Sequence, residues 1–236
     1  MPREFELRKE VELSATPEQV WAAITTEAGM SAWFMPMADV TRDGPGVTAW
    51  DPGHHLTVTT PTGEDGSTHA FEYLIEARDG GSTVLRFVHS GILGEDWNTE
   101  YEGMTNLGWD MYLHTLAEYF THFAGRTATY VHADGPAASA AGDAWPVLLD
   151  RLGITSAPAR GERVRLTPDG LAAIDGVADW ASPAFVGVRT DDALYRFHDR
   201  AALGMPIAVG HHVYDTTVDG RVAAKLWHTW LHRTFA

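Results

Sequence analysis

The chain has 236 residues, 44% of them hydrophobic and 21% charged, which is enough to bury a core in one large domain or two small ones. It contains no cysteine, and this excludes disulfides, thiol catalysis and cysteine-ligated metal clusters. Its net charge of -15 disfavours binding to nucleic acid or to an anionic membrane surface, because both are negatively charged.

Hydropathy gives no sign of membrane insertion or secretion. No apolar run approaches the roughly 18 residues of a membrane span. The first residues, from Met1 to Phe5, lack the apolar core of a signal peptide. We therefore expect a cytoplasmic protein that binds neither nucleic acid nor membranes.

The chain opens with a predicted strand followed by a short helix. Residues 3–13 alternate between apolar and polar side chains, with a change of phase near Lys9 that suggests a bulge. Thr16 is a good helix N-cap, Pro17 suits the first helical position, and Gln19 completes a capping box. Gly29 is the expected end of this helix.

Between residues 47 and 90 the apolar period is two, which indicates strands. The candidates are residues 47–50, 55–59, 69–76 and 83–89. The sequence Asp79-Gly80-Gly81 predicts a hairpin turn between the last two. Large side chains at alternate positions of these two strands predict the inner face of a curved sheet, formed by Phe71, Tyr73, Ile75, Leu85, Phe87 and His89.

Residues 98–123 form the longest helical pattern in the chain. One apolar side includes Trp109, Leu113 and Leu116, which we expect to face the sheet. A second apolar group lies almost opposite and includes Leu107 and Met111. A helix that packs on a single sheet needs only one apolar stripe, so we expect the C-terminal half of the chain to cover the second.

Small and flexible residues predict a linker over residues 126–143, which would separate a domain of residues 1–125 from one of residues 144–236. In the second domain we expect helices and strands in a similar order, namely a helix over 143–152, strands over 163–166, 185–189, 193–198 and 207–214, and a helix over 220–235. Trp21 and His89 are spaced almost as Trp145 and His212 are, which suggests a divergent repeat.

Several short motifs in the first half occur in an order that resembles a known family. They are Ala15 to Trp21 after the opening strand, the Trp33-Phe34 turn, Trp50-Asp51-Pro52, the hairpin strand from Thr83 to Gly91, and Gly108-Trp109. Residues 3–123 resemble the SRPBCC superfamily (START-like, helix-grip). Within it they are most similar to the branch named for activators of the heat-shock chaperone ATPase.

The resemblance implies an α+β helix-grip fold, in which a curved antiparallel sheet wraps around a long C-terminal helix. Such folds keep a deep apolar cavity between sheet and helix for lipids, polyketides or other hydrophobic molecules. Fold alone does not choose a function. For the second half, element order alone suggests a smaller α+β domain of related topology, a degenerate unit of the same kind.

The predicted ligand-binding residues follow from the inner face of the sheet and from the long helix. Their alternative role is a filled hydrophobic core. They are Phe71, Tyr73, Leu85, Phe87, His89, Trp109, Leu113 and Leu116.

Three residues are candidates for acid–base chemistry. His89 has the ordinary pKa of a general base, about 6.5, and otherwise serves as a structural histidine. Glu102 would act as an acid if buried, and otherwise snorkels at the start of the helix, where its charge favours the dipole. Tyr73 is the third candidate.

Metal and cofactor motifs are absent from the sequence. His228 and His232 are spaced four residues apart on a predicted helix, but no HExxH-type pattern surrounds them. We expect neither a metal nor a cofactor. The leading hypothesis is a protein that binds a hydrophobic small molecule. The alternatives are a cyclase, hydratase or hydrolase that uses His89, and a co-chaperone-like interaction module with a protein partner or a second copy.

Overall fold

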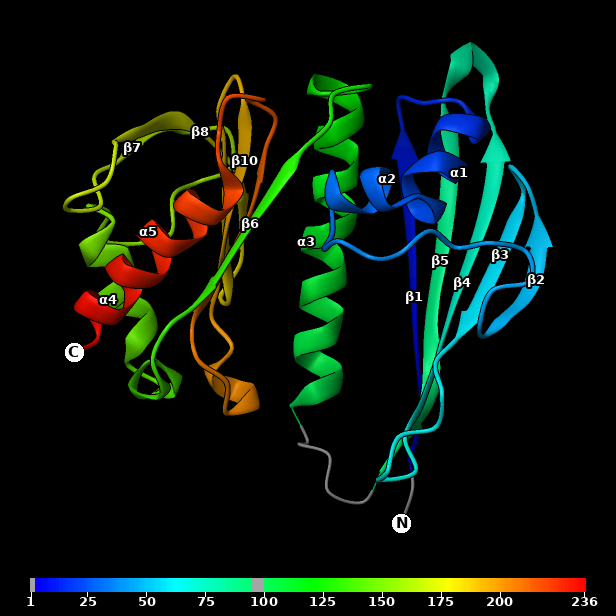
Figure 1. The fold of residues 1–236 in the computed structure, drawn as a ribbon, viewed down its shortest axis with the longest axis horizontal. Helices are drawn as coiled ribbons and strands as arrows, with labels where there is room; N and C mark the ends of the chain where they lie inside the picture. The colour runs from blue at the N-terminus through cyan, green and yellow to red at the C-terminus, as the bar shows by residue number, and fades with distance from the viewer. Residues whose placement is uncertain (1–2, 95–99) are drawn as a thin grey trace. The chain divides into compact units, whose positions relative to one another are not determined.

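The computed structural model describes residues 3–94 and 100–236, and the chain forms two units. The first contains Met1–Glu102 and Tyr112–Gly125, and the second contains Gly103–Met111 and Arg126–Ala236. Each unit is built on one antiparallel sheet, and five α-helices occur in the described residues (Figure 1). The predicted α+β class is therefore confirmed.

The sheet of the first unit has the strand order β1-β5-β4-β3-β2. Its first strand along the chain therefore pairs with its last. The strands are β1 (Arg3–Leu13), β2 (Val47–Asp51), β3 (His55–Thr59), β4 (Thr68–Ala77) and β5 (Thr83–Leu93).

The predicted phase change in β1 is wrong. β1 pairs with β5 in unbroken register from Arg3 to Leu13. The apolar residues of β1 all occupy odd-numbered positions, so Lys9 simply takes one inward position within a regular alternation.

Two short helices, α1 (Pro17–Thr25) and α2 (Glu27–Ser31), follow β1. The predicted capping box is present, because the Thr16 side chain accepts from the Gln19 N–H and the Gln19 side chain accepts from the Thr16 N–H. Gly29 does not end α1 as predicted. Instead, its N–H donates to the Thr26 hydroxyl, which caps the start of α2.

The predicted hairpin between β4 and β5 is confirmed, with a 3-10 turn over Asp79–Gly81 in which Gly80 has a φ of 81°. The long helix is α3 (Tyr101–His122). Residues 98 and 99, where we predicted its start, lie outside the described residues. In the part of the chain that the structure describes, no helix combines the length and apolar character that crossing a bilayer requires.

The sheet of the second unit has the order β6-β11-β10-β9-β8-β7, so here too the first strand pairs with the last. Helices α4 (Ala144–Arg151) and α5 (Gly220–Thr234) belong to this unit. Its strands are β6 (Thr129–Asp134), β7 (Arg163–Leu166), β8 (Ile174–Ala181), β9 (Phe185–Arg189), β10 (Ala193–His198) and β11 (Ala208–Val213).

The prediction of a linker over residues 126–143 needs correction. Strand β6 lies within this range and pairs with β11. Val131 and Ala133 are buried on one face of β6, and small side chains are sufficient there. β8 was also not predicted, since Asp175, Gly176 and a register shift near Ala178 interrupt its apolar alternation.

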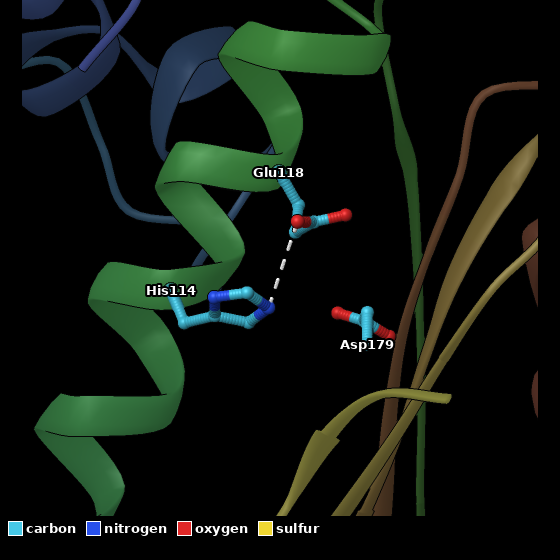
Figure 2. Close-up of side chains that lie close together, drawn as sticks. All are labelled: His114, Glu118 and Asp179. Carbon is cyan, nitrogen blue, oxygen red and sulfur yellow. Dashed lines mark ion pairs between the residues drawn. The ribbon is translucent and has the colours of Figure 1, made fainter. Parts of the chain in front are cut away.

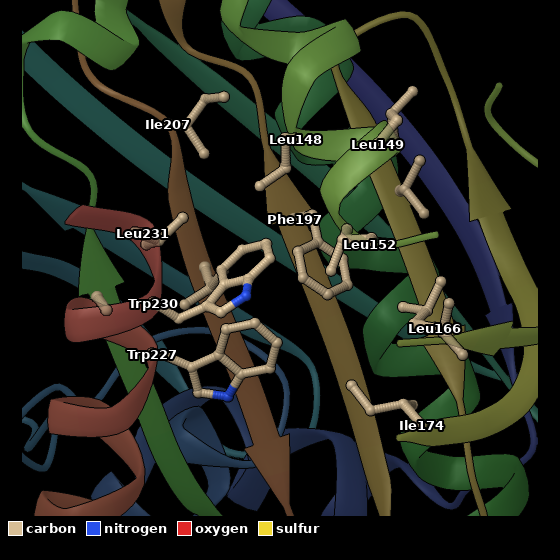
Figure 3. Close-up of a cluster of buried hydrophobic side chains, with 14 of the residues drawn as sticks. Leu148, Leu149, Leu152, Leu166, Ile174, Phe197, Ile207, Trp227, Trp230 and Leu231 are labelled. Atoms are coloured by element: carbon tan, nitrogen blue, oxygen red, sulfur yellow. The ribbon is translucent and has the colours of Figure 1, made fainter. Parts of the chain in front are cut away.

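The core of the second unit lies between one face of its sheet and the two helices (Figure 3). α4 contributes Leu148 and Leu149, and α5 contributes Trp227, Trp230 and Leu231. Phe197 of β10 lies among them and is fully buried. Burial of each large apolar side chain stabilises the fold by roughly 1.5–3 kcal/mol, so this cluster anchors α4 and α5 to the sheet.

Candidate functional site

The candidate site lies on one face of the first sheet. On β5, Leu85, Phe87 and His89 share this face, and all three are buried, as their alternation predicts. Across the strands His89 pairs with Phe71 of β4 and with Leu7 of β1. The sheet therefore places the His89 imidazole between two apolar side chains.

A second histidine lies next to His89. His69 of β4 is two residues before Phe71, and its Nδ1 is 3.1 Å from the Nε2 of His89. One of these nitrogens donates an N–H and the other accepts it, depending on the tautomer. The pair is thus a short hydrogen-bonded chain of two imidazoles.

Aromatic rings surround the histidine pair. The Phe71 ring stacks on His89 at a centroid distance of 4.5 Å, and Phe5 meets His89 edge-on at 4.9 Å. The ring centroid of Tyr101, in the first turn of α3, lies 6.2 Å from that of His69 and 6.1 Å from that of Phe5. We call His69, His89, Phe5, Phe71 and Tyr101 the aromatic cluster.

Exposure changes along this face of the sheet. Near the β4–β5 turn, Leu13, Ile75 and Leu85 are buried. Toward the other end, His69 and Phe71 of the aromatic cluster are only partly buried, as is Val58 of β3. The face is therefore a closed core at one end and an accessible aromatic surface at the other.

The electrostatics of the pair favour neutral imidazoles. Burial, together with a smaller effect of the neighbouring His69, lowers the pKa of His89 to about 4. Burial also lowers the pKa of His69, although the charge of Asp65 partly opposes this. Near pH 7 both rings are neutral, so each offers one donor and one acceptor nitrogen.

The structure separates the other two acid–base candidates from each other. Tyr73 is buried against Phe87 at a ring distance of 5.0 Å, and burial raises its pKa. The Glu102 side chain is 45% exposed and lies 3.7 Å from Arg3, so it is a surface group and not the buried acid considered above. The structure instead brings His69 to the His89 ring.

The predicted residues of α3 do not all belong to the first unit. Leu113 and Leu116 are buried within its Tyr112–Gly125 segment. Trp109 is buried too, but it lies in Gly103–Met111, which belongs to the second unit. The two units divide α3 along its length between Met111 and Tyr112, and the role of Trp109 in a ligand pocket stays a prediction.

Other polar groups are buried outside the aromatic cluster. His114 and Glu118 lie one turn apart on α3, with Nε2 3.7 Å from Oε1 (Figure 2). Figure 2 also labels Asp179, which belongs to β8 of the second unit. Within its own unit, Asp179 accepts two hydrogen bonds from the guanidinium of Arg196, at 3.0 and 2.7 Å. The side chains of Arg196 and Asp179 are 0% and 3% exposed, so this ion pair is shielded from water.

Histidine and carboxylate side chains are the metal ligands that a chain without cysteine can offer. The rings of His228 and His232 stack on α5 with centroids 4.0 Å apart, and both side chains are exposed. Within either unit taken alone, the described residues bring no three histidine or carboxylate ligands together around one point.

Sequence reasoning missed His69, Phe5 and Tyr101 as members of the site. A signal for His69 was present, because it precedes Phe71 by two residues and a strand places such positions on one face. Phe5 could be placed only once the pairing of β1 with β5 was known. Tyr101 depends on where α3 begins, which helical periodicity alone does not fix.

Several solved structures are similar to this chain at low identity. DynU16, a protein of the dynemicin biosynthetic locus, is 14% identical, with a TM-score of 0.43 over 98% of this chain and 95% of its own. The Aha1 dimer from Colwellia psychrerythraea is 19% identical, with a TM-score of 0.39 over 49% of this chain and 96% of its own. CalU16 from Micromonospora echinospora is 16% identical, with a TM-score of 0.37 over 51% of this chain and 87% of its own. No family model and no curated protein matches the sequence.

Proposed function

We propose that the first unit binds a hydrophobic small molecule at the aromatic cluster. The observation that carries this proposal is the partly exposed ring of Phe71, which lies beside the hydrogen-bonded pair of His69 and His89. Ligand sites are clefts lined mostly by apolar and aromatic side chains, with a few polar groups that fix orientation. The aromatic cluster has this composition.

The arrangement of the rings favours a flat ligand. The ring planes of His69 and Phe71 are 13° apart, and those of Phe71 and Phe87 are 15° apart. Phe87 is fully buried, so an added ring would stack on the nearly parallel and partly exposed rings of His69 and Phe71. Such stacking contributes about 0.5–1.5 kcal/mol beyond burial. A hydroxyl or carbonyl oxygen on such a ligand would match the imidazole nitrogens.

Binding of the probe 2-naphthol, followed by its fluorescence, tests this proposal. Phe71→Leu keeps an apolar side chain but removes the ring, so we expect about three- to tenfold weaker binding. His69→Gln should weaken binding to a similar extent, because the paired imidazole is lost. Circular dichroism and urea unfolding show whether each variant folds.

His55→Gln is the matched control. His55 lies on β3, on the opposite face of the same sheet, where its Nε2 is 2.8 Å from the Glu72 carboxylate. This variant should bind 2-naphthol as the unmodified protein does. Equal binding by all variants, or equal loss in His55→Gln, would contradict the proposal.

A second candidate function is acid–base catalysis on the bound molecule, of the cyclase, hydratase or hydrolase type. The contact between His69 and His89 favours it, because hydrogen-bonded imidazoles can pass a proton from one ring to the other. Incubation with keto-enol substrates in deuterated water tests it. Deuterium exchange that His89→Gln abolishes even at substrate concentrations that saturate the variant supports catalysis, and equal exchange in both proteins contradicts it.

A further inference from the structure

The outward side of α5 exposes two large apolar residues. Val222 is 55% exposed and Leu226, one turn later, is 50% exposed. Trp230 follows after another turn and is buried in the core of the second unit. The apolar stripe of α5 thus continues from the core onto the surface.

A hollow of about 410 Å³ lies at this stripe, between α5 and the loop that holds Asp169 to Leu171. Leu171, Val222, Leu226 and Trp230 supply its apolar lining. This volume falls within the range of small-molecule sites, roughly 300–1,000 Å³. We call this hollow the α5 groove.

The loop wall of the α5 groove is fixed to the helix. Arg233 of α5 donates to the backbone carbonyl of Asp169, and its Nη2 lies 3.4 Å from the Asp169 carboxylate. Gly170 has a φ of +79°, and a Cβ there would lie 3.2 Å from Nη2 of Arg233. A residue without a side chain lets the guanidinium lie over the turn.

The charge at the α5 groove is opposite to that of the whole chain. The protein has a net charge of -15 and only two lysines, Lys9 and Lys225. Lys225 lines the groove, and among the described residues it makes no ion pair. The one carboxylate in the lining, Asp169, already pairs with Arg233. An anionic group at this rim would therefore find an available cation.

We propose that the α5 groove binds a hydrophobic carboxylic acid, with the alkyl chain on Val222 and Leu226 and the carboxylate at Lys225. A second copy of the chain is a poorer occupant, because a two-fold contact would bring two lysine-bearing grooves together. A protein partner needs about 800 Å² of surface on each side, far more than two exposed side chains offer.

Titration calorimetry with octanoate and with 1-octanol tests the two parts of the site. Lys225→Gln should weaken octanoate binding about tenfold and leave octanol binding unchanged. Leu226→Ser should weaken binding of both. Val147→Ser is the matched control, because Val147 is 39% exposed on α4 and does not line the groove. Octanoate binding that Lys225→Gln leaves unaltered would overturn the proposal, as would a dimer that Leu226→Ser dissociates.

Reductive methylation with ¹³C-formaldehyde locates the ligand, because it labels the two lysines and keeps their charge. Octanoate should shift the NMR signal of Lys225 and leave that of Lys9 in place. Lys9 lies on the same sheet face as His89, opposite Phe87 of β5. A shift of Lys9 alone would place octanoate at the first unit and overturn this proposal, and it would leave the aromatic cluster as the binding site.

Discussion

His89 and His211 occupy equivalent positions in their two sheets. Each lies on the last strand of its sheet, opposite an apolar residue of the first strand, Leu7 for His89 and Val131 for His211. The His211 ring lies 4.7 Å from Trp227 and 5.3 Å from Phe197. Both histidines are therefore buried among aromatic rings on the core side of their sheet.

This correspondence corrects the spacing argument made from the sequence. The spacing paired His89 with His212, but His212 points to the other face of the second sheet, where its ring lies 5.3 Å from Tyr130. A shift of one residue on a strand reverses the face. The shared strand order and histidine position are what a divergent repeat requires, and the repeat itself stays a prediction.

Acid should destabilise the second unit through His211. Burial holds its pKa well below the usual 6.5, so the unfolded chain takes up the proton first. The free energy of unfolding should be highest above about pH 6.5 and should fall as the pH decreases below it. Urea unfolding between pH 7.5 and pH 5 measures this trend. A free energy of unfolding that does not fall over this range would contradict the assignment.

His211→Phe should make that decline shallower but should not abolish it, because the pKa of buried His198 is also lowered, to about 3. The same variant removes the Nδ1 atom that accepts a hydrogen bond from the Arg196 N–H at 3.1 Å. We therefore expect a loss of about 1–3 kcal/mol at pH 7.5. An unchanged acid slope in this variant would exclude His211 as a source of the pH dependence.

Breaking the Arg196–Asp179 pair should be costly. Arg196→Met leaves the Asp179 carboxylate buried without its guanidinium, and such a change typically costs 3–5 kcal/mol (about half of a domain's stability). The double variant Arg196→Met with Asp179→Leu should recover most of the loss, because an apolar pair replaces the ion pair. Urea unfolding of the two single variants and the double variant gives the coupling. A double variant no more stable than Arg196→Met would show that the charges are not the reason.

Gly187→Ala tests the space around the Arg196 guanidinium. A Cβ at Gly187 would lie 2.7 Å from Nη1 of Arg196 and 2.9 Å from Cβ of Trp180, so the neighbours must move. We expect a loss of about 1–3 kcal/mol. Gly142→Ala is the control, because its Cβ would meet no heavy atom within 4 Å. Thermal unfolding of both variants should show a clear decrease in Tm for Gly187→Ala alone.

Thr16→Ala should weaken the start of α1. The variant removes the hydroxyl that accepts the Gln19 N–H, which typically costs about 1 kcal/mol. Thr16→Ser keeps the acceptor and should retain most of the stability. Chemical unfolding of both variants makes the comparison, and an equal loss in the two would assign the effect to the methyl group and not to the cap.

Local signals in the sequence predicted much of the fold. Residues 55–59, 163–166, 185–189 and 193–198 form strands with the predicted bounds, because their alternation and flanking turns are strong. β6 was assigned to a linker because a stretch of small and flexible residues begins at its end, at Ala133. Its place in the sheet depends on a partner, β11, that lies far along the chain.

The candidate site was predictable only in part. The strand period placed His89 on the inner face, and the structure agrees. It could not show that His69 lies within hydrogen-bond distance, because that depends on the register between β4 and β5. Nor could periodicity assign the two apolar sides of α3, since an apolar stripe does not specify what covers it.

The pairing of first and last strands has a consequence for how the chain matures on the ribosome. β1 is the first strand of its sheet to be synthesised, but its partner β5 is the last, since Phe5 pairs with Gly91. β6 waits in the same way for β11, where Val131 pairs with His211. Neither sheet can close until its last strand has emerged, so each nascent unit depends on long-range contacts that form slowly. An arrest of translation before β5 would leave β1 with an unpaired edge, which is the kind of surface that chaperones protect.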